Sequence, residues 1–121
     1  MYLSGDKLYT SVDKTLYVYL VSDINFPIAT YSLSNRCSSG MISDNRLYLS
    51  GNPFLKIFDL TTSLSQPLSP VKEIKTKSIV FKILRAGHSL LLGELSGWFE
   101  IFDINTLNIT STHKFEEAYS I

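Results

Sequence analysis

One pattern occurs three times along this chain of 121 residues. Each copy has a short apolar segment, a few Asp, Asn, Gly, Pro or Ser residues, and a second apolar segment with an aromatic residue near its end. The copies occupy residues 7–20, 46–60 and 89–104. Their late aromatic residues, Tyr19, Phe58 and Phe102, lie 39 and 44 residues apart. A spacing of about 40 to 45 residues is typical of four-stranded β units, whereas common helical repeats are about 33 residues long. The spacing therefore favours a repeated all-β fold.

Each copy also predicts a β-hairpin, because two apolar segments are separated by a short polar turn. Hydrophobic residues make up 45% of the chain, with seven Tyr and seven Phe, and these types suit pleated sheets. We expect the second and third strands of the three units at residues 7–11 and 15–20, 46–50 and 54–60, and 89–93 and 98–104. Outer strands are expected at residues 27–33, 71–75 and 108–115, and inner strands at 36–42 and 78–84. The nearly continuous apolar run 79–84 predicts a strand that is covered on both faces.

Residues 55–60 and 99–104 resemble the closing strand of WD repeats, in which an aromatic residue and an Asp end the third strand. Residues 43–51 are similar to the polar turn and second strand of that family. The resemblance implies an all-β fold, a β-propeller arc of about three four-stranded antiparallel blades; the alternative is another all-β architecture such as a sandwich. We expect one partial propeller domain over residues 1–121, with blades near 1–35, 36–77 and 78–118 and the start of a further strand at 119–121.

The chain departs from the WD pattern at several positions. The Gly-His pair that precedes the inner strand in that family is missing, and Gly87-His88 falls between strands, where it predicts a turn. Ser11 and Ser50 match the family's hydroxyl position and Asp13 its acid, but the His and Trp partners are absent. The recurring Asp59 and Asp103 are expected to accept backbone hydrogen bonds at strand ends.

Three blades do not close a ring, because propellers have about 4 to 8 blades. We therefore expect one of three arrangements: the chain is a piece of a longer propeller, two copies associate to give six blades, or the fold is a different all-β one.

Charge and composition exclude several classes of function. Eleven Lys plus Arg balance eleven Asp plus Glu, so nucleic acid is not an expected partner. Neither a secretory signal nor an apolar run long enough to cross a membrane is present in the sequence. The single cysteine, Cys37, favours a reducing intracellular compartment, with the cytoplasm as the simplest location.

Catalysis has little support in the sequence. His88 and His113 lie in unlike contexts without a Cys or a second His at ligand spacing, and Cys37 is interpreted as a small buried residue. We expect no enzyme activity, cofactor or metal. The alternative, a propeller enzyme of unknown reaction, would need acids or histidines on several inner strands, and those strands offer Arg36, Cys37, Met41, Val80, Phe81 and Lys82.

The favoured function is a non-catalytic protein-interaction scaffold of WD-repeat type, whose protein partner the sequence does not identify. Trp98 is the strongest candidate anchor. The candidate contacts are turn residues at one end of the blades: Asp13, Lys14, Asn52, Phe54, Ser96 and Trp98.

Two weaker features remain. A basic strip for nucleic acid or a phosphopeptide would use Lys72, Lys75, Lys77, Lys82 and Arg85, although a solvated blade edge is the favoured interpretation. Ser69 precedes Pro70 in a Ser- and Pro-rich loop and resembles a phosphorylation site that would act on Lys72 and Lys75.

Overall fold

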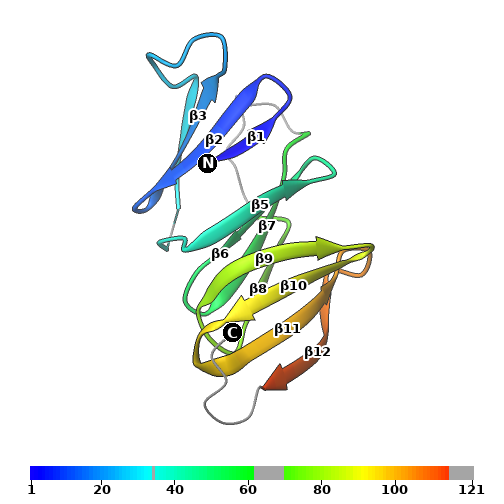
Figure 1. Ribbon diagram of the computed structural model, residues 1–121. Helices are drawn as coiled ribbons and strands as arrows, with labels where there is room; N and C mark the ends of the chain where they lie inside the picture. The colour runs from blue at the N-terminus through cyan, green and yellow to red at the C-terminus, as the bar shows by residue number, and fades with distance from the viewer. Residues whose placement is uncertain (34, 62–69, 115–121) are drawn as a thin grey trace.

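A computed structural model describes residues 1–33, 35–61 and 70–114, and it contains three four-stranded antiparallel sheets (Figure 1). The first sheet has β1 (Tyr2–Ser4), β2 (Lys7–Val12), β3 (Thr15–Leu20) and β4 (Ala29–Ser32). The second has β5 (Ser39–Ser43), β6 (Arg46–Ser50), β7 (Phe54–Asp59) and β8 (Lys72–Lys75). The third has β9 (Val80–Ala86), β10 (Ser89–Glu94), β11 (Trp98–Asp103) and β12 (Asn108–Lys114). Each sheet is built from consecutive strands. The predicted three-sheet architecture is confirmed, and we call the sheets blades 1, 2 and 3.

The six strands of the repeated hairpins lie where the sequence pattern places them, to within one residue at their ends. Three features differ. The outer strand β4 begins two residues later than the expected residue 27 and ends one residue before residue 33. The inner strands β5 and β9 begin two or three residues later than expected, because residues before them form the connections between blades. Blade 1 also has an inner strand, β1, which pairs with β2 but is only three residues long. So short a segment carries no periodicity, and the sequence did not predict it.

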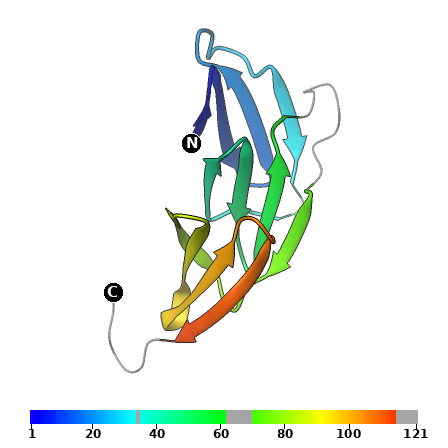
Figure 2. The ribbon, with the colours of Figure 1, turned by 90° about the vertical axis from the view of Figure 1, so that its right-hand side faces the viewer.

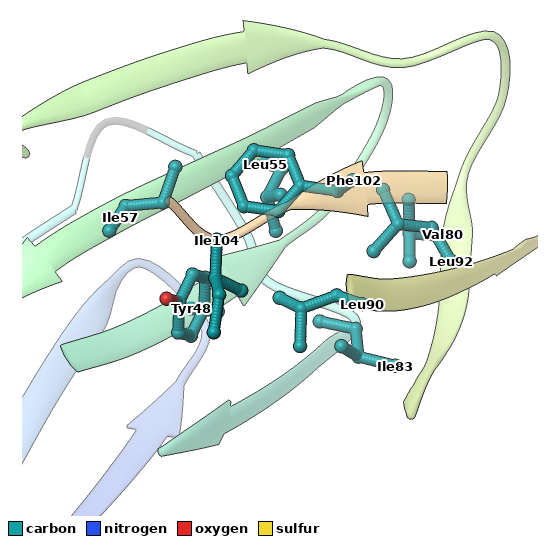
Figure 3. Packing of buried hydrophobic residues seen from close by; sticks show 9 residues of the cluster. All are labelled: Tyr48, Leu55, Ile57, Val80, Ile83, Leu90, Leu92, Phe102 and Ile104. Carbon is teal, nitrogen blue, oxygen red and sulfur yellow. The ribbon is translucent and has the colours of Figure 1, made fainter. Parts of the chain in front are cut away.

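The blades stack face to face, with their inner strands side by side (Figures 1 and 2). Two apolar clusters lie between them. The first joins blades 1 and 2, and the second joins blades 2 and 3 (Figure 3). Because successive side chains of a strand point to opposite faces, the middle blade, blade 2, contributes one set of residues to each cluster.

Equivalent positions of the repeat bury equivalent faces. We call the side of a blade that faces the next blade in the chain its forward face, and the opposite side its backward face. Forward-face residues Tyr9, Leu16 and Val18 of blade 1 pack with backward-face residues Leu47, Leu49 and Phe58 of blade 2. The same positions one unit later, Tyr48, Leu55 and Ile57, pack with Leu90, Leu92 and Phe102 of blade 3. The repeat in the sequence therefore reflects the same packing interface, which occurs once between blades 1 and 2 and once between blades 2 and 3.

The prediction that both faces of strand β9 are covered was wrong. Val80 and Ile83 are buried against blade 2, but Phe81 and Leu84 are 51% and 50% exposed. The run 79–84 was expected to be covered on both faces; instead, Phe81 and Leu84 lie toward the forward face of blade 3, which is the last blade of the stack.

The recurring aspartates act as expected at strand ends. Asp59 Oδ1 accepts a hydrogen bond from the Thr61 amide at 2.9 Å, and Asp103 Oδ1 accepts one from the Asn105 amide at 2.7 Å. The bonds from Thr61 keep the pKa of Asp59 below its ordinary value. Gly87 lies in the β9–β10 turn with φ of 61°, which confirms the turn interpretation.

Replacing Asp103 with alanine should lower the free energy of unfolding by about 1 kcal/mol, because two turn amides lose their acceptor. Urea unfolding of the variant measures this loss. Asp6→Ala, in the exposed β1–β2 turn, is the matched control and should change stability by less than about 0.5 kcal/mol. Equal losses in both variants would contradict the role of Asp103.

Candidate functional site

The turns between the second and third strands and the connections between blades lie at the same end of the sheets, because successive strands alternate in direction. Backbone hydrogen bonds join the two kinds of segment: Leu33 N donates to Lys14 O at 2.7 Å, and Leu95 N donates to Ile79 O at 2.9 Å. We call this end of the molecule the turn end. It comprises residues 13–14, 33–38, 51–54, 76–79 and 95–98, apart from residue 34, which lies outside the description. All six sequence-predicted contact residues are there.

Blade 1 contributes an exposed, charged turn. Asp13 has φ of 55° and pairs with Arg36 of the following connection, Nε to Oδ1, at 2.6 Å. Both side chains are mostly exposed, so the pair contributes little to stability. Lys14 is exposed beside it. Burial raises the pKa of the neighbouring Cys37 thiol, which argues against a reactive thiolate.

In blade 2 the turn is packed more tightly. Phe54 is only 6% exposed, and a Cβ on Gly51 would lie 2.4 Å from its ring, so glycine is required for this close approach. The ammonium group of Lys56 lies 4.9 Å from the centre of the same ring and 3.2 Å from Asn35 Oδ1. Phe54 therefore holds the turn in place and offers little contact surface, whereas Asn52 is exposed.

A shallow cleft of about 290 Å³ opens beside this turn. Its polar lining mixes both signs of charge with two amides. The lining residues are Asn35, Asn52, Pro53, Phe54, Glu73, Ile74 and Lys75.

Blade 3 presents Trp98 at the start of β11. Its ring is half-buried, belongs to neither apolar cluster, and has two ammonium groups near it, Lys77 Nζ at 5.3 Å and Lys114 Nζ at 5.2 Å from ring centres. Cations within about 6 Å of an indole face attract it. Ser96, with φ of 65°, is exposed in the adjacent turn. Trp98 therefore combines a rigid aromatic surface with local positive charge.

Two buried acids support this end of blade 3, and the sequence did not single them out. Glu94 and Glu100 are each 3% exposed. A Glu94 oxygen accepts from the Ser78 amide at 2.8 Å, and Glu100 Oε1 accepts from the Lys77 amide at 2.8 Å. Both carboxyl groups thus hold the connection between blades 2 and 3.

Glu94 is expected to keep its proton at neutral pH, because its pKa is raised. Burial and the hydrogen bond with Glu100 raise the pKa of Glu94 to about 8. Glu94 Oε2 is buried and meets no protein donor, and Glu100 Oε2 already accepts from the Thr112 hydroxyl at 2.7 Å. A protonated Glu94 that donates to Glu100 satisfies the buried oxygen and removes the repulsion between two charges.

The residues of the expected basic strip have separate surroundings. Lys72 donates to Asn108 at 2.7 Å, Lys77 lies over Trp98, and Arg85 pairs with Asp44 at 2.7 Å. Lys75 lies on β8 and Lys82 on β9, in different blades. Phosphate binding by these residues stays a prediction. Ser69 and the expected strand at 119–121 lie outside the described residues.

A metal site and a membrane-spanning helix have no support in residues 1–33, 35–61 and 70–114. These residues include no group of three or more His, Cys, Asp or Glu side chains able to hold a metal ion. His113 stacks on Phe99 with ring centres 4.7 Å apart, which is a packing contact. Within the same part of the chain, no helix has the length and apolar character needed to cross a bilayer.

Comparison with known proteins places the fold. No family model and no curated protein sequence matches the chain. Among solved structures, a chain from the crystal structure of the mitotic checkpoint complex is similar, with a TM-score of 0.75 and 14% sequence identity over 93% of this chain. The fold is a β-propeller arc. This arc spans 36% of the length of the solved chain. At that identity the likeness concerns the fold alone, and the blades of the arc are the three sheets described above.

Proposed function

We propose that the chain is a non-catalytic protein-interaction scaffold of WD-repeat type, which contacts a protein partner through its turn end. The support is threefold. The fold is a β-propeller arc, propeller strands provide rigid positions for turns, and the described residues assemble a surface of turns rather than a set of reacting groups. The compartment we propose is intracellular, in accord with the single cysteine of the sequence, which has no second cysteine with which to form an intramolecular disulfide.

Trp98 is the observation that carries this proposal. Interface anchors are enriched in Trp because its ring offers a large rigid area with few rotatable bonds. The ring stands at the end of a blade, outside both apolar clusters, and Lys77 and Lys114 surround it with positive charge. A partner that brings an acidic side chain beside an apolar one would complement both properties.

Replacing Trp98 with alanine should weaken partner binding by about tenfold or more, which corresponds to a loss of about 1.4 kcal/mol. Affinity purification from the source cell with quantitative mass spectrometry identifies the bound proteins, and titration with a purified partner measures the loss. Circular dichroism of the variant establishes that the blades remain folded.

Phe26→Ala is the matched control, because Phe26 is also an aromatic residue, is 77% exposed and lies between β3 and β4, away from the turn end. It should bind the partner with unchanged affinity. Equal recovery of the same proteins by wild type, Trp98→Ala and Phe26→Ala would exclude Trp98 as the anchor.

A further inference from the structure

The Trp98 ring lies at the junction of blades 2 and 3, both of which are present in the structure. Glu100, two residues further along β11, accepts a hydrogen bond from the Lys77 amide in the connection between these blades. The ammonium group of the same Lys77 lies 5.3 Å from the centre of a Trp98 ring. The ring is therefore on the side of blade 3 that faces blade 2, and its partial exposure does not arise from an uncovered outer face of the stack.

Blade 2 has an aromatic residue at the same position of the repeat, and there the chain itself covers the ring. Phe54 corresponds to Trp98, because each opens the third strand of its blade and pairs with a lysine of the outer strand. The ammonium group of Lys56 lies 4.9 Å from the centre of the Phe54 ring and 3.7 Å from Glu73 Oε1. Blade 2 therefore combines an aromatic ring, a cation and a carboxylate within one chain.

Blade 3 has the ring and the cations of this set without the carboxylate. The two positions of the blade 2 ion pair hold Glu100 and Thr112, which form a hydrogen bond of 2.7 Å with each other. The cations come instead from Lys77 and Lys114, which are both exposed. Within residues 1–33, 35–61 and 70–114, no carboxylate lies within ion-pair distance of either ammonium group.

The surroundings of the ring suit a carboxylate that has an apolar neighbour. Leu95, in the turn that leads into β11, is 45% exposed and adds apolar surface beside the start of the strand. Attraction between a cation and an aromatic ring strengthens when water is excluded, so an apolar group placed on the ring reinforces the charged contact. Both flanking cations are lysines, whereas arginine is the usual residue for bidentate recognition of phosphate.

We infer that Trp98, Lys77 and Lys114 bind a segment of the partner protein in which an Asp or Glu side chain lies next to a bulky apolar one. The carboxylate of the partner provides for blade 3 what Glu73 provides for blade 2, and the apolar side chain covers the indole ring. The two lysines therefore determine which segments are accepted, and the indole ring contributes most of the contact area. This inference rests on the proposed function, because it specifies the chemistry of the partner that the turn end binds.

Four synthetic peptides provide the test. They differ only in one central residue between two leucines, which is glutamate, glutamine, lysine or phosphoserine. Each peptide is titrated into the 121-residue chain, and the fluorescence of Trp98, its one tryptophan, reports binding. The glutamate peptide should bind about tenfold more tightly than the glutamine peptide, and the lysine peptide should bind most weakly. Added salt should reduce the advantage of glutamate.

Charge variants test whether the two lysines carry this preference. The double variant Lys77→Gln, Lys114→Gln should bind the glutamate and glutamine peptides with equal affinity. The double variant Lys77→Glu, Lys114→Glu should instead prefer the lysine peptide. Lys82→Glu is the matched control, because Lys82 is also exposed and lies on β9, at the opposite edge of blade 3 from β12. It should keep the preference for glutamate, and circular dichroism checks that each variant is folded.

Three outcomes would overturn the inference. The first is equal affinity of the wild type for all four peptides, or no response to the glutamate peptide at about 1 mM. The second is a preference for glutamate that persists in the double glutamine variant. The third is a phosphoserine peptide that binds about tenfold more tightly than the glutamate peptide, which would assign the site to phosphorylated segments. None of them decides the scaffold proposal, because recovery of the native partner by Trp98→Ala tests that proposal without these peptides.

Discussion

Replacing Phe102 with alanine is expected to lower the free energy of unfolding by about 3 to 5 kcal/mol, the usual cost of removing a buried aromatic ring from a core. Phe102 is fully buried in the cluster between blades 2 and 3, where its ring and the ring of Tyr48 form a T-shaped pair with centres 6.2 Å apart (Figure 3). Urea unfolding followed by the fluorescence of Trp98, the one tryptophan of the chain, measures the loss.

The matched control is again Phe26→Ala, which removes the same side chain from a site that is 77% exposed. Its effect should stay within about 0.5 kcal/mol. The difference in the free energy of unfolding between the two variants gives the contribution of the packing between blades 2 and 3, separate from any general effect of removing a phenylalanine ring. A loss below about 1 kcal/mol for Phe102→Ala would contradict the packing of blade 3 on blade 2.

This junction also explains why the fold could be predicted from the sequence. The apolar positions of the hairpins, such as Leu47, Leu49 and Phe58, recur because each blade must fill the same space against its neighbour. Because the same packing requirement recurs in each blade, the same apolar pattern recurs in the sequence. The pairing register of the hairpins then sets the positions of the strands. The short strand β1 left no such pattern. The exposure of Phe81 and Leu84 depends on which blades are present, and that is a property of the whole assembly rather than of a local run of residues.

The turn end was only partly predictable for a related reason. Turn chemistry marked Asp13, Asn52 and Ser96, because polar residues between apolar runs indicate chain reversal. It did not show that Phe54 is buried, since that depends on the contact of its ring with Gly51. It also did not reveal Glu94 and Glu100, which are six positions apart and meet because β10 and β11 pair. The one available signal for these buried acids was that each lies on an otherwise apolar strand, at a position that does not have to face solvent.

Stability is expected to fall as pH rises from about 5 to about 8, because Glu94 holds a proton in the folded chain that the unfolded chain has already released. The folded pKa of about 8 lies above the ordinary value of 4.5. Between these values the folded state binds one more proton than the unfolded state, so the free energy of unfolding declines as the pH rises. The loss levels off above about pH 8, where both states have released the proton.

Glu94→Gln should remove most of this slope. Its amide oxygen can accept from the Ser78 amide as Glu94 does at 2.8 Å, and its NH₂ group can donate to Glu100 in place of the shared proton. The variant should therefore match the wild type near pH 5 and exceed its stability above about pH 8, in urea unfolding measured across that range. Glu73→Gln, which neutralises an acid whose side chain is 55% exposed, should keep the wild-type slope.

An unchanged slope in Glu94→Gln would mean that the two acids do not share a proton. The variants also separate the two tasks that these carboxyl groups combine. The hydrogen bonds that the two carboxyl groups accept from the Lys77 and Ser78 amides hold the connection between blades 2 and 3 at every pH. The shared proton, in contrast, determines whether the two buried acids can lie close together. Because Lys77 lies over the Trp98 ring as well, a connection loosened at high pH would also disturb the surface proposed for partner binding. Partner affinity of the wild type should then decline above about pH 8, and that of Glu94→Gln should not.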